Sequence, residues 1–263
     1  MTPRSRRLFV AAAVLLSACG VVGGWYGTGL GFTQEPADVA TAATTEPVDV
    51  AAASGAVGDV LARAGLVRGG VVDAAAVRAL VDKLPADTHA RTPAYDRAAY
   101  GPSWADTDHN GCDQRNDVLA RDLTVVTYTK ADPGCTVATG HLTDVYTGRS
   151  IDFTRGKTTS AAVQIDHLVP LGWAWQHGAA GWSGDRREQL ATDFNNLQAV
   201  DGPTNEAKSD QGPATWLPPA AGYDCMYVTR FAYVLSTYEL TIDDADRAAI
   251  DRTLDGCSSR AAG

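Results

Sequence analysis

Three polar segments in the second half of the chain hold residue types suited to metal-assisted hydrolysis of a phosphodiester. A carboxylate and an imidazole stand side by side at Asp166 and His167, and amides follow at Asn196 and Asn205. Such hydrolysis needs a base that activates water and a cation that holds developing charge. Histidine, with an ordinary pKa of about 6.5, suits the base at neutral pH. Oxygen donors without thiolate or a second histidine favour Mg²⁺ or Mn²⁺ over Zn²⁺.

Two short strands and a helix must position these residues. The sequence predicts strands over residues 162–166 and 195–200, and a turn after the second strand brings Pro203 to the first position of a helix. Asn205 and Lys208, three residues apart, then share one face of that helix. Because neighbouring residues on a strand point to opposite faces, the adjacent carboxylate and imidazole must be turned at the end of the strand.

The order of these motifs along the chain is similar to that in a known protein family. The motifs are Asp166-His-Leu-Val-Pro170, then Asn196, then Asn205-x-x-Lys208-Ser-Asp210, with Tyr95-Asp-Arg97 and Gly111-Cys-Asp113-x-Arg115 upstream. This arrangement resembles the HNH (ββα-metal) nucleases, in particular the secreted bacterial HNH family that shares a domain with the C-terminal part of the GmrSD restriction enzymes. The resemblance covers residues 95 to 257.

The resemblance implies a role for each site residue. His167 would be the general base, and Asn196 would brace the loop that carries it. Asp166 and Asn205 would hold Mg²⁺ (or Mn²⁺), and Lys208 would contact a phosphate. The implied substrate is nucleic acid, DNA favoured over RNA, cut to 5′-phosphate and 3′-hydroxyl products. The alternative is a catalytically inactive protein of the same fold that serves as a calcium-dependent surface binding module.

Composition and charge restrict how such a protein could hold nucleic acid. The chain has 263 residues, of which 45% are hydrophobic and 20% charged, as in ordinary globular proteins. It carries 22 Lys and Arg against 31 Asp and Glu, a net charge of −9. This balance excludes binding through a broad basic face, so phosphates must be held by a local site.

The first 19 residues have the pattern of an export signal. Three arginines precede an apolar run over residues 8–16, and small residues then lead to Cys19. The segment 16–19 resembles a bacterial lipobox, in which the cysteine is lipidated. The uncharged stretch 8–34 leaves a single membrane-spanning anchor as an alternative, and plain secretion is the third. All three place the body of the protein outside the cytoplasm.

Four further cysteines suit two disulfides in an oxidising compartment. Cys225 opens an apolar stretch that a turn separates from a second helix, which predicts an antiparallel helix pair. The start of the first helix would lie beside the end of the second. We therefore predict the pair Cys225–Cys257, which leaves Cys112–Cys135 as the second disulfide.

A second metal site is suggested upstream. Asp106-x-Asp108-x-Asn110-Gly matches the start of a calcium-binding loop, and Asp117 falls at its twelfth position. The usual Glu is absent there and no incoming helix is evident. An ordinary turn with the disulfide as neighbour is the alternative, because Asp, Asn and Gly are common turn residues.

The remaining charged and imidazole side chains give weaker signals. Arg115 and Arg187 could contact substrate phosphate or serve structural contacts, the latter favoured for Arg187. His109, His141 and His177 lack partners at metal-ligand spacing. We expect these histidines at the surface or in satisfied hydrogen bonds.

These observations predict an α+β fold, a ββα-metal core with surrounding helices and a C-terminal helix pair. Residues 1–19 are expected to form the signal peptide of the lipoprotein type or an anchor. Residues 20–71, rich in Ala, Thr and Gly, are expected to form a flexible tether, and residues 72–258 the nuclease domain. The expected protein is an extracytoplasmic monomer, attached to the membrane through its N-terminal lipid or anchor.

Overall fold

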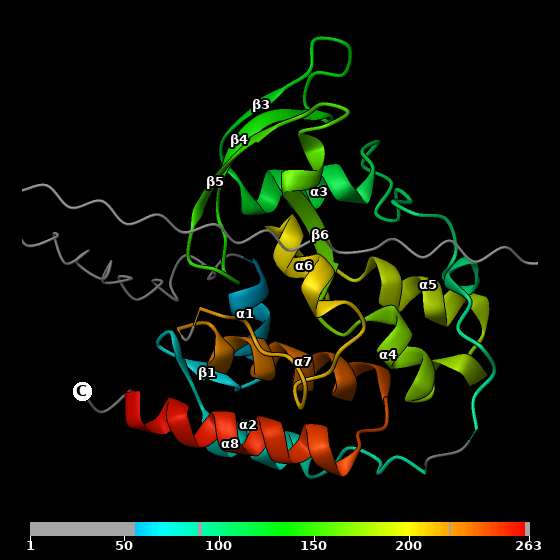
Figure 1. Ribbon diagram of the computed structural model, residues 1–263, viewed down its shortest axis with the longest axis vertical. Coiled ribbons are helices and arrows are strands. Elements are labelled where there is room, and N and C mark those ends of the chain that lie inside the picture. Colours follow the sequence, from blue (N-terminus) through cyan, green and yellow to red (C-terminus); the bar gives the residue numbers. More distant parts are fainter. Residues whose placement is uncertain (1–55, 89–90, 221, 261–263) are drawn as a thin grey trace, which may run out of the picture. The chain divides into compact units, whose positions relative to one another are not determined.

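The segment that carries the predicted site is a two-stranded antiparallel sheet followed directly by a helix. The computed structural model describes residues 56–88, 91–220 and 222–260, which combine helices with small antiparallel sheets, so the predicted α+β class is confirmed (Figure 1). Strand β6 (Val163–His167) pairs with β7 (Leu197–Asp201), and His167 stands opposite Leu197. Helix α6 (Gly202–Lys208) begins at the residue after β7.

Local sequence explains why α6 begins where it does. The Asp201 carboxylate caps the helix by accepting a hydrogen bond from Thr204 N at 3.0 Å, and Pro203 occupies the first turn. A Cβ on Gly202 would lie 2.1 Å from the Ala161 carbonyl oxygen. Glycine therefore permits the close approach that sets α6 against the start of β6.

The connection between β6 and β7 holds three helical segments. They are α4 (Leu171–Gln176), the 3-10 helix η4 (Ala179–Gly181) and α5 (Gly184–Thr192). Ser183 caps α5 by accepting a hydrogen bond from Arg186 N. This long connection places the end of α5 close to the strand end that carries His167.

A second sheet lies against helix α3 (Gln114–Asp122) (Figure 1). Its antiparallel strands are β3 (Thr124–Tyr128), β4 (Val137–Thr143) and β5 (Ser150–Thr154), with the 3-10 helix η3 (Ser160–Ala162) following. Strand β5 was not predicted, because its alternation spans only five residues. Its Phe153 is buried with Leu119 and Ile165 in the core between this sheet and β6.

The larger core is built from helices. They are α2 (Ala74–Val81), the 3-10 helix η2 (Arg97–Tyr100), α7 (Asp224–Tyr238) and α8 (Asp244–Arg260). The disulfide Cys225–Cys257 joins the start of α7 to the end of α8, with 5.8 Å between the Cα atoms. The disulfide Cys112–Cys135 joins the segment before α3 to the β3–β4 connection. Both pairings are those predicted.

The predicted tether is wrong over residues 56–71. Helix α1 (Ala56–Arg63) is followed by a hairpin of β1 (Val67–Arg68) and β2 (Val71–Val72). Leu61 of α1 is fully buried in the larger core. Val57 and Leu61, one helical turn apart, form an apolar stripe that the surrounding Ala and Gly residues concealed in composition.

The export signal over residues 1–19, with Cys19, lies outside the described residues, as do the proposed anchor and the first part of the tether. Within the described ranges, no helix is both long enough and apolar enough to cross a membrane.

Candidate active site

His167, the last residue of β6, has one ring nitrogen committed to a structural contact. Its Nε2 lies 2.9 Å from the carbonyl oxygen of Ala191 near the end of α5. A carbonyl oxygen only accepts, so this nitrogen carries the hydrogen and Nδ1 is left with the lone pair. Burial lowers the pKa of His167 to about 4, against the opposing effect of the Ala191 carbonyl. The imidazole is therefore neutral at pH 7 and can accept a proton at Nδ1.

Asn196 holds the backbone that follows His167. Its side-chain oxygen accepts a hydrogen bond from Val169 N at 2.8 Å, and its amide nitrogen lies 3.2 Å from the Val169 carbonyl oxygen. Its own carbonyl oxygen accepts from Leu168 N at 2.8 Å. The side chain is fully buried. These contacts are those that a brace for the His167 loop requires.

Asp166 is a buried carboxylate with two donors. Lys208 Nζ donates to its Oδ1 at 2.9 Å, and the Tyr146 hydroxyl donates to its Oδ2. Lys208 also donates to the His167 carbonyl oxygen at 2.9 Å and lies 5.9 Å from the centre of the Trp216 ring. Burial lowers the pKa of Lys208, while Asp166 opposes that shift. The Asp166 side chain is 6% exposed.

The position of Lys208 corrects the expectation that it contacts substrate phosphate. Its side chain has no exposed surface, and its ammonium pairs with the buried Asp166 carboxylate. Sharing a helix face with Asn205 fixed only the direction of the Cα–Cβ bond. The flexible four-carbon stem allowed the ammonium to reach the buried carboxylate instead.

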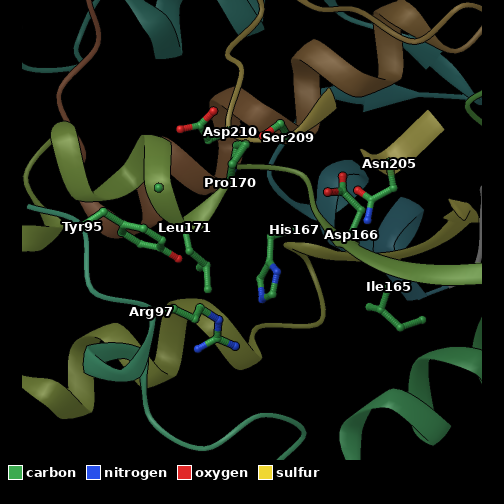
Figure 2. Close-up of a pocket in the computed structure, with 11 residues that line it drawn as sticks. Tyr95, Arg97, Ile165, Asp166, His167, Pro170, Leu171, Asn205, Ser209 and Asp210 are labelled. Atoms are coloured by element: carbon green, nitrogen blue, oxygen red, sulfur yellow. The ribbon is translucent and has the colours of Figure 1, made fainter. Parts of the chain in front are cut away.

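Asn205 on α6 offers an oxygen to the same pocket. Its Nδ2 donates to Gln164 Oε1 at 2.8 Å, and Gln164 in turn donates to Glu206 at 2.9 Å. This network orients the amide, and within the described chain no hydrogen bond occupies its Oδ1. The Asn205 amide and the Asp166 carboxylate lie side by side in Figure 2. A carboxylate and an amide oxygen in one cavity fit a hard divalent cation.

A pocket of about 350 Å³ contains these groups (Figure 2). Asp166, His167 and Asn205 line it together, although Asp166 and His167 are adjacent on β6. The end of the strand thus turns both side chains to one cavity, as the sequence required. Ser209 and Asp210, directly after α6, complete that side of the pocket.

The opposite side of the pocket holds two residues to which the sequence assigned no role. Tyr95 and Arg97 line it from a segment some seventy residues before His167. In Figure 2 the imidazole lies between Arg97 and the Asp166–Asn205 pair. Asp96 caps η2 by accepting from Ala98 N, which fixes the backbone at Arg97. Arg97 is exposed and has no hydrogen bond or ion pair with any described residue, so its guanidinium is available to an anion in the pocket.

The two weaker phosphate candidates are committed to backbone contacts. Arg115 donates to the carbonyl oxygens of Ser160 and Val163 at 3.2 and 2.9 Å. Arg187 donates to three carbonyl oxygens, those of Ala99, Ala179 and Trp182. Both guanidinium groups therefore tie segments together around the site, and neither lines the pocket.

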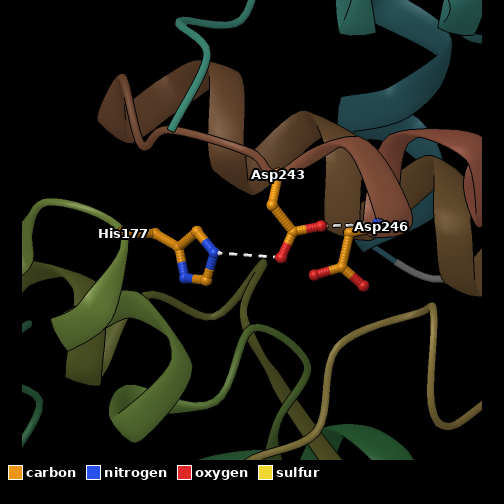
Figure 3. Close-up of side chains that lie close together, drawn as sticks. All are labelled: His177, Asp243 and Asp246. Atoms are coloured by element: carbon orange, nitrogen blue, oxygen red, sulfur yellow. Dashed lines mark hydrogen bonds and ion pairs between the residues drawn. The ribbon is translucent and has the colours of Figure 1, made fainter. Parts of the chain in front are cut away.

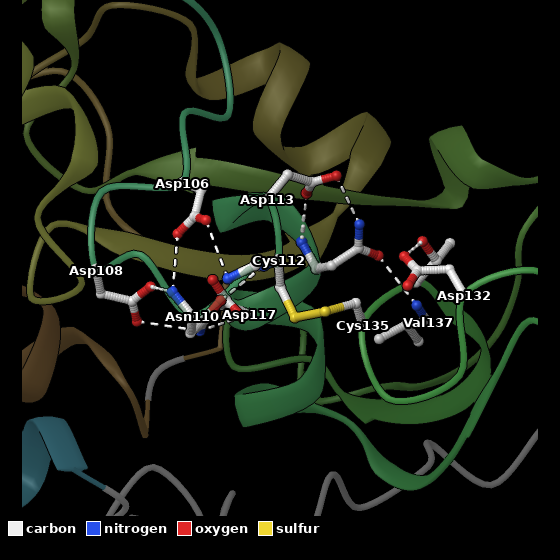
Figure 4. Close-up of a disulfide and its surroundings, with 12 residues drawn as sticks. Asp106, Asp108, Asn110, Cys112, Asp113, Asp117, Asp132, Cys135 and Val137 are labelled. Atoms are coloured by element: carbon white, nitrogen blue, oxygen red, sulfur yellow. Dashed lines mark hydrogen bonds between the residues drawn. A yellow bond between two sulfur atoms is a disulfide. The ribbon is translucent and has the colours of Figure 1, made fainter.

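The candidate calcium loop brings its four residues together (Figure 4). The backbone nitrogen of Asn110 donates to Asp106 and Asp108 at 3.2 Å each, and its side-chain amide donates to Asp108 and Asp117. Burial raises the pKa of Asp117, and the neighbouring carboxylates add to this shift. Asn110 thus occupies the space among the carboxylates in the way of an ordinary turn, and calcium binding here stays a prediction.

His141 and His177 lie in different surroundings. His141 is exposed and pairs with Asp152, as a surface residue would. His177 is buried and faces the carboxylates of Asp243 and Asp246, which come from a distant helix. Only the packing of α4 against α8 creates this cluster, and no local spacing could have predicted it.

Comparison with known proteins identifies a family and a relative of this chain. Residues 113–251 match the family described as GmrSD restriction endonucleases, C-terminal domain. A protein of the fungus Arthroderma benhamiae, described as an uncharacterized secreted protein, is 37% identical over 158 residues, which are 59% of this chain and 72% of that protein. No solved structure matches the chain. The fungal relative supports the secreted part of the expected resemblance and not its restriction to bacteria.

Proposed function

Because this chain belongs to the family of GmrSD restriction endonuclease C-terminal domains, we propose that it is an extracytoplasmic, metal-dependent endonuclease. It hydrolyses phosphodiester bonds of nucleic acid, DNA in preference to RNA. The observation that carries the proposal is the single pocket shared by His167, Asp166 and Asn205. Imidazole and oxygen ligands in one cavity are what an HNH-type hydrolysis requires.

His167 is the general base. The Ala191 carbonyl holds Nε2 in its protonated form, so Nδ1 accepts the proton of the attacking water. Its lowered pKa keeps the ring neutral over the whole neutral range. Asn196 acts as a positioning residue, because it fixes the backbone on which the ring is carried.

Asp166 and Asn205 would hold the divalent ion, Mg²⁺ or Mn²⁺. When bound, such an ion stabilises the charge that develops on the leaving 3′ oxygen. Lys208 and Tyr146 orient Asp166, and Gln164 orients Asn205. Each ligand thus has a partner that limits its motion before the ion arrives.

Arg97 takes over the role that we had expected of Lys208. It is the exposed cation on the rim of the pocket, opposite the metal ligands. Because the chain has a net charge of −9, it cannot hold nucleic acid through a broad basic face. A local cation such as Arg97 can hold a phosphate instead.

Export is supported by two observations. Both disulfides require an oxidising compartment, and the fungal relative is described as secreted. Lipidation of Cys19, with attachment of a monomer to the membrane, is the form of export that the N-terminal sequence favours.

A cleavage assay tests the function. The purified chain is incubated with plasmid DNA and with RNA, each with Mg²⁺ and with a chelator. We expect chelator-sensitive cleavage, and we expect His167→Ala to lower the rate on the order of 10²–10⁴-fold. His141→Ala, an exposed histidine far from the pocket residues in sequence, is the matched control. Full cleavage by His167→Ala would refute the mechanism.

The second candidate is an inactive binding module, which the gathered carboxylates of the Asp106 loop favour. It predicts no cleavage with any divalent ion and a rise in melting temperature on addition of Ca²⁺, lost in Asp108→Asn. Chelator-sensitive cleavage by the wild-type chain rejects it.

A further inference from the structure

A histidine and two aspartates converge away from the pocket (Figure 3). His177 follows α4, and Asp243 and Asp246 stand at the start of α8. One ligand atom from each residue lies within 4.8 Å of the others. The cluster joins segments some seventy residues apart in the sequence.

The imidazole of His177 presents a lone pair to this cluster. Its Nδ1 lies 2.8 Å from the Trp173 carbonyl oxygen, so Nδ1 carries the hydrogen of the neutral ring. The ring stacks on Trp173, with 3.5 Å between centroids, and the side chain is 9% exposed. Its Nε2 is 3.7 Å from Asp243 Oδ2, too far for a hydrogen bond. The His177 side chain is thus nine-tenths buried, and its Nε2 lone pair faces a carboxylate with no hydrogen bond between them.

The two carboxylates keep acceptor capacity on the side of His177. Asp243 Oδ1 caps α8 by accepting from Asp246 N at 2.7 Å, and its Oδ2 faces the imidazole. Asp246 accepts from Trp173 Nε1 and from Ala214 N. Burial raises the pKa of Asp246, and the charge of Asp243 contributes to this shift. In the described part of the chain, no lysine or arginine forms an ion pair with either carboxylate.

We propose that His177, Asp243 and Asp246 bind one divalent cation of the class that prefers imidazole, with Zn²⁺ as its representative. One neutral imidazole and two carboxylates neutralise a charge of +2. Ligand bonds of about 2.0–2.1 Å place the ligand atoms of a tetrahedral zinc site roughly 3.3 Å apart. The observed separations are 3.7 Å from His177 Nε2 to Asp243 Oδ2 and at most 4.8 Å within the cluster, so the three side chains would close around the ion on binding. The hydrogen bond from Nδ1 to a carbonyl is the usual outer partner of a ligating histidine.

The ion has a structural role. It ties the end of α4 to the start of α8, and through Asp246 it ties both to the loop at Ala214. The nuclease pocket lies at the other end of α4, where Leu171 and Gly172 line it. The donor set also differs, because the pocket offers a carboxylate and an amide oxygen for a hard ion, and the cluster offers an imidazole.

Calorimetric titration with Zn²⁺ tests the proposal without nucleic acid. The tag-free full chain is stripped of metal and titrated at pH 7.5 in millimolar Mg²⁺, which occupies the oxygen site of the pocket. We expect one zinc ion per chain, and we expect His177→Gln and Asp243→Asn to weaken binding by about 10–100-fold or more. Asp243→Asn retains an acceptor that caps α8, so it guards against loss of fold. His141→Gln and Asn205→Ala should bind zinc like the wild type.

Thermal unfolding supplies a second readout. At a zinc concentration of about 100 times the dissociation constant, the wild-type melting temperature should rise by about 5 °C or more, and that of the two cluster variants should not. Unchanged zinc affinity in both folded variants would overturn the proposal. A wild-type chain that binds no zinc, and whose stability instead falls as the pH rises from 6 to 8, would also overturn it in favour of a protonated His177 paired with Asp243.

Discussion

Lys208 Nζ lies 2.9 Å from Asp166 Oδ1, and neither side chain is open to solvent beyond 6%. The pair joins the end of α6 to the end of β6, so it closes the strand–strand–helix unit on itself. The ammonium of Lys208 balances the charge of this buried carboxylate and limits its motion. In the proposed mechanism, Lys208 would therefore orient the metal ligand Asp166 and would not contact the substrate.

Lys208→Met should destabilise the protein. Removing one partner of a buried ion pair leaves the other charge uncompensated, which costs about 3–5 kcal/mol. Urea unfolding at pH 7.5 measures this loss, and Lys157→Met, at an exposed position, is the control with little expected change. If Lys208→Met has wild-type stability and only a raised KM, Lys208 contacts a substrate phosphate, and the structural role given to it here is wrong.

Arg97→Gln should weaken substrate binding without affecting the fold. Loss of a charge-assisted contact of about 1.5–3 kcal/mol lowers kcat/KM by roughly 10–100-fold. The salt dependence of KM should also become less steep, since one phosphate contact is lost. Arg252→Gln, an exposed arginine of α8, is the matched control. Equal kcat/KM and equal salt dependence in both variants would show that Arg97 does not touch the substrate.

Activity should depend on pH through His167. The ring must be neutral to accept a proton, and burial lowers its pKa to about 4. The acid limb of the kcat/KM profile should therefore lie at about pH 4, well below the ordinary histidine value of about 6.5. A limb at pH 6 or above in the wild type would show that the ring is solvated in the working enzyme.

The free energy of unfolding should also depend on pH, because folding lowers the pKa of His167. In the unfolded chain His167 binds a proton below about pH 6.5, whereas the folded chain resists protonation down to about pH 4. The unfolded state therefore binds more protons in this window, and the free energy of unfolding falls as the pH drops through it. Urea unfolding at pH 7.5 and pH 5 should show a smaller pH effect in His167→Gln than in His141→Gln. An equal effect in both would contradict the shift.

The sequence predicted the segments whose pattern is local. The strand that holds Asp166, the strand that begins directly after Asn196, the helix after Pro203, and the pairing of Cys225 with Cys257 follow from alternation, turn chemistry and helix length. Strand β5 and helix α1 escaped prediction because each is short. Leu61 is an example, because a segment with a single apolar stripe among alanines differs little in composition from a flexible tether.

The parts of the site that escaped prediction depend on contacts between distant segments. Arg97 reaches the pocket because η2 packs against α5, and no spacing in the sequence encodes that contact. His177 meets Asp243 for the same reason, through the packing of α4 near the start of α8. The sequence placed Lys208 on the correct face of its helix. The contact that such a long, flexible side chain makes depends on the packing of the core, which local spacing does not reveal.

Asn196→Ala should act on His167 from a distance. The substitution leaves the buried Val169 N–H without its acceptor, at a cost of about 1–3 kcal/mol, and loosens the backbone after His167. A looser loop admits water to the imidazole, so its pKa should move up from about 4 toward the ordinary value. We therefore expect kcat to fall with KM little changed, and the acid limb of the pH profile to move upward. The neighbouring Asn195→Ala is the control and should leave that limb in place, because among the described residues the Asn195 side chain bonds only Asp193. A lower melting temperature with an unmoved acid limb would reduce Asn196 to a packing residue.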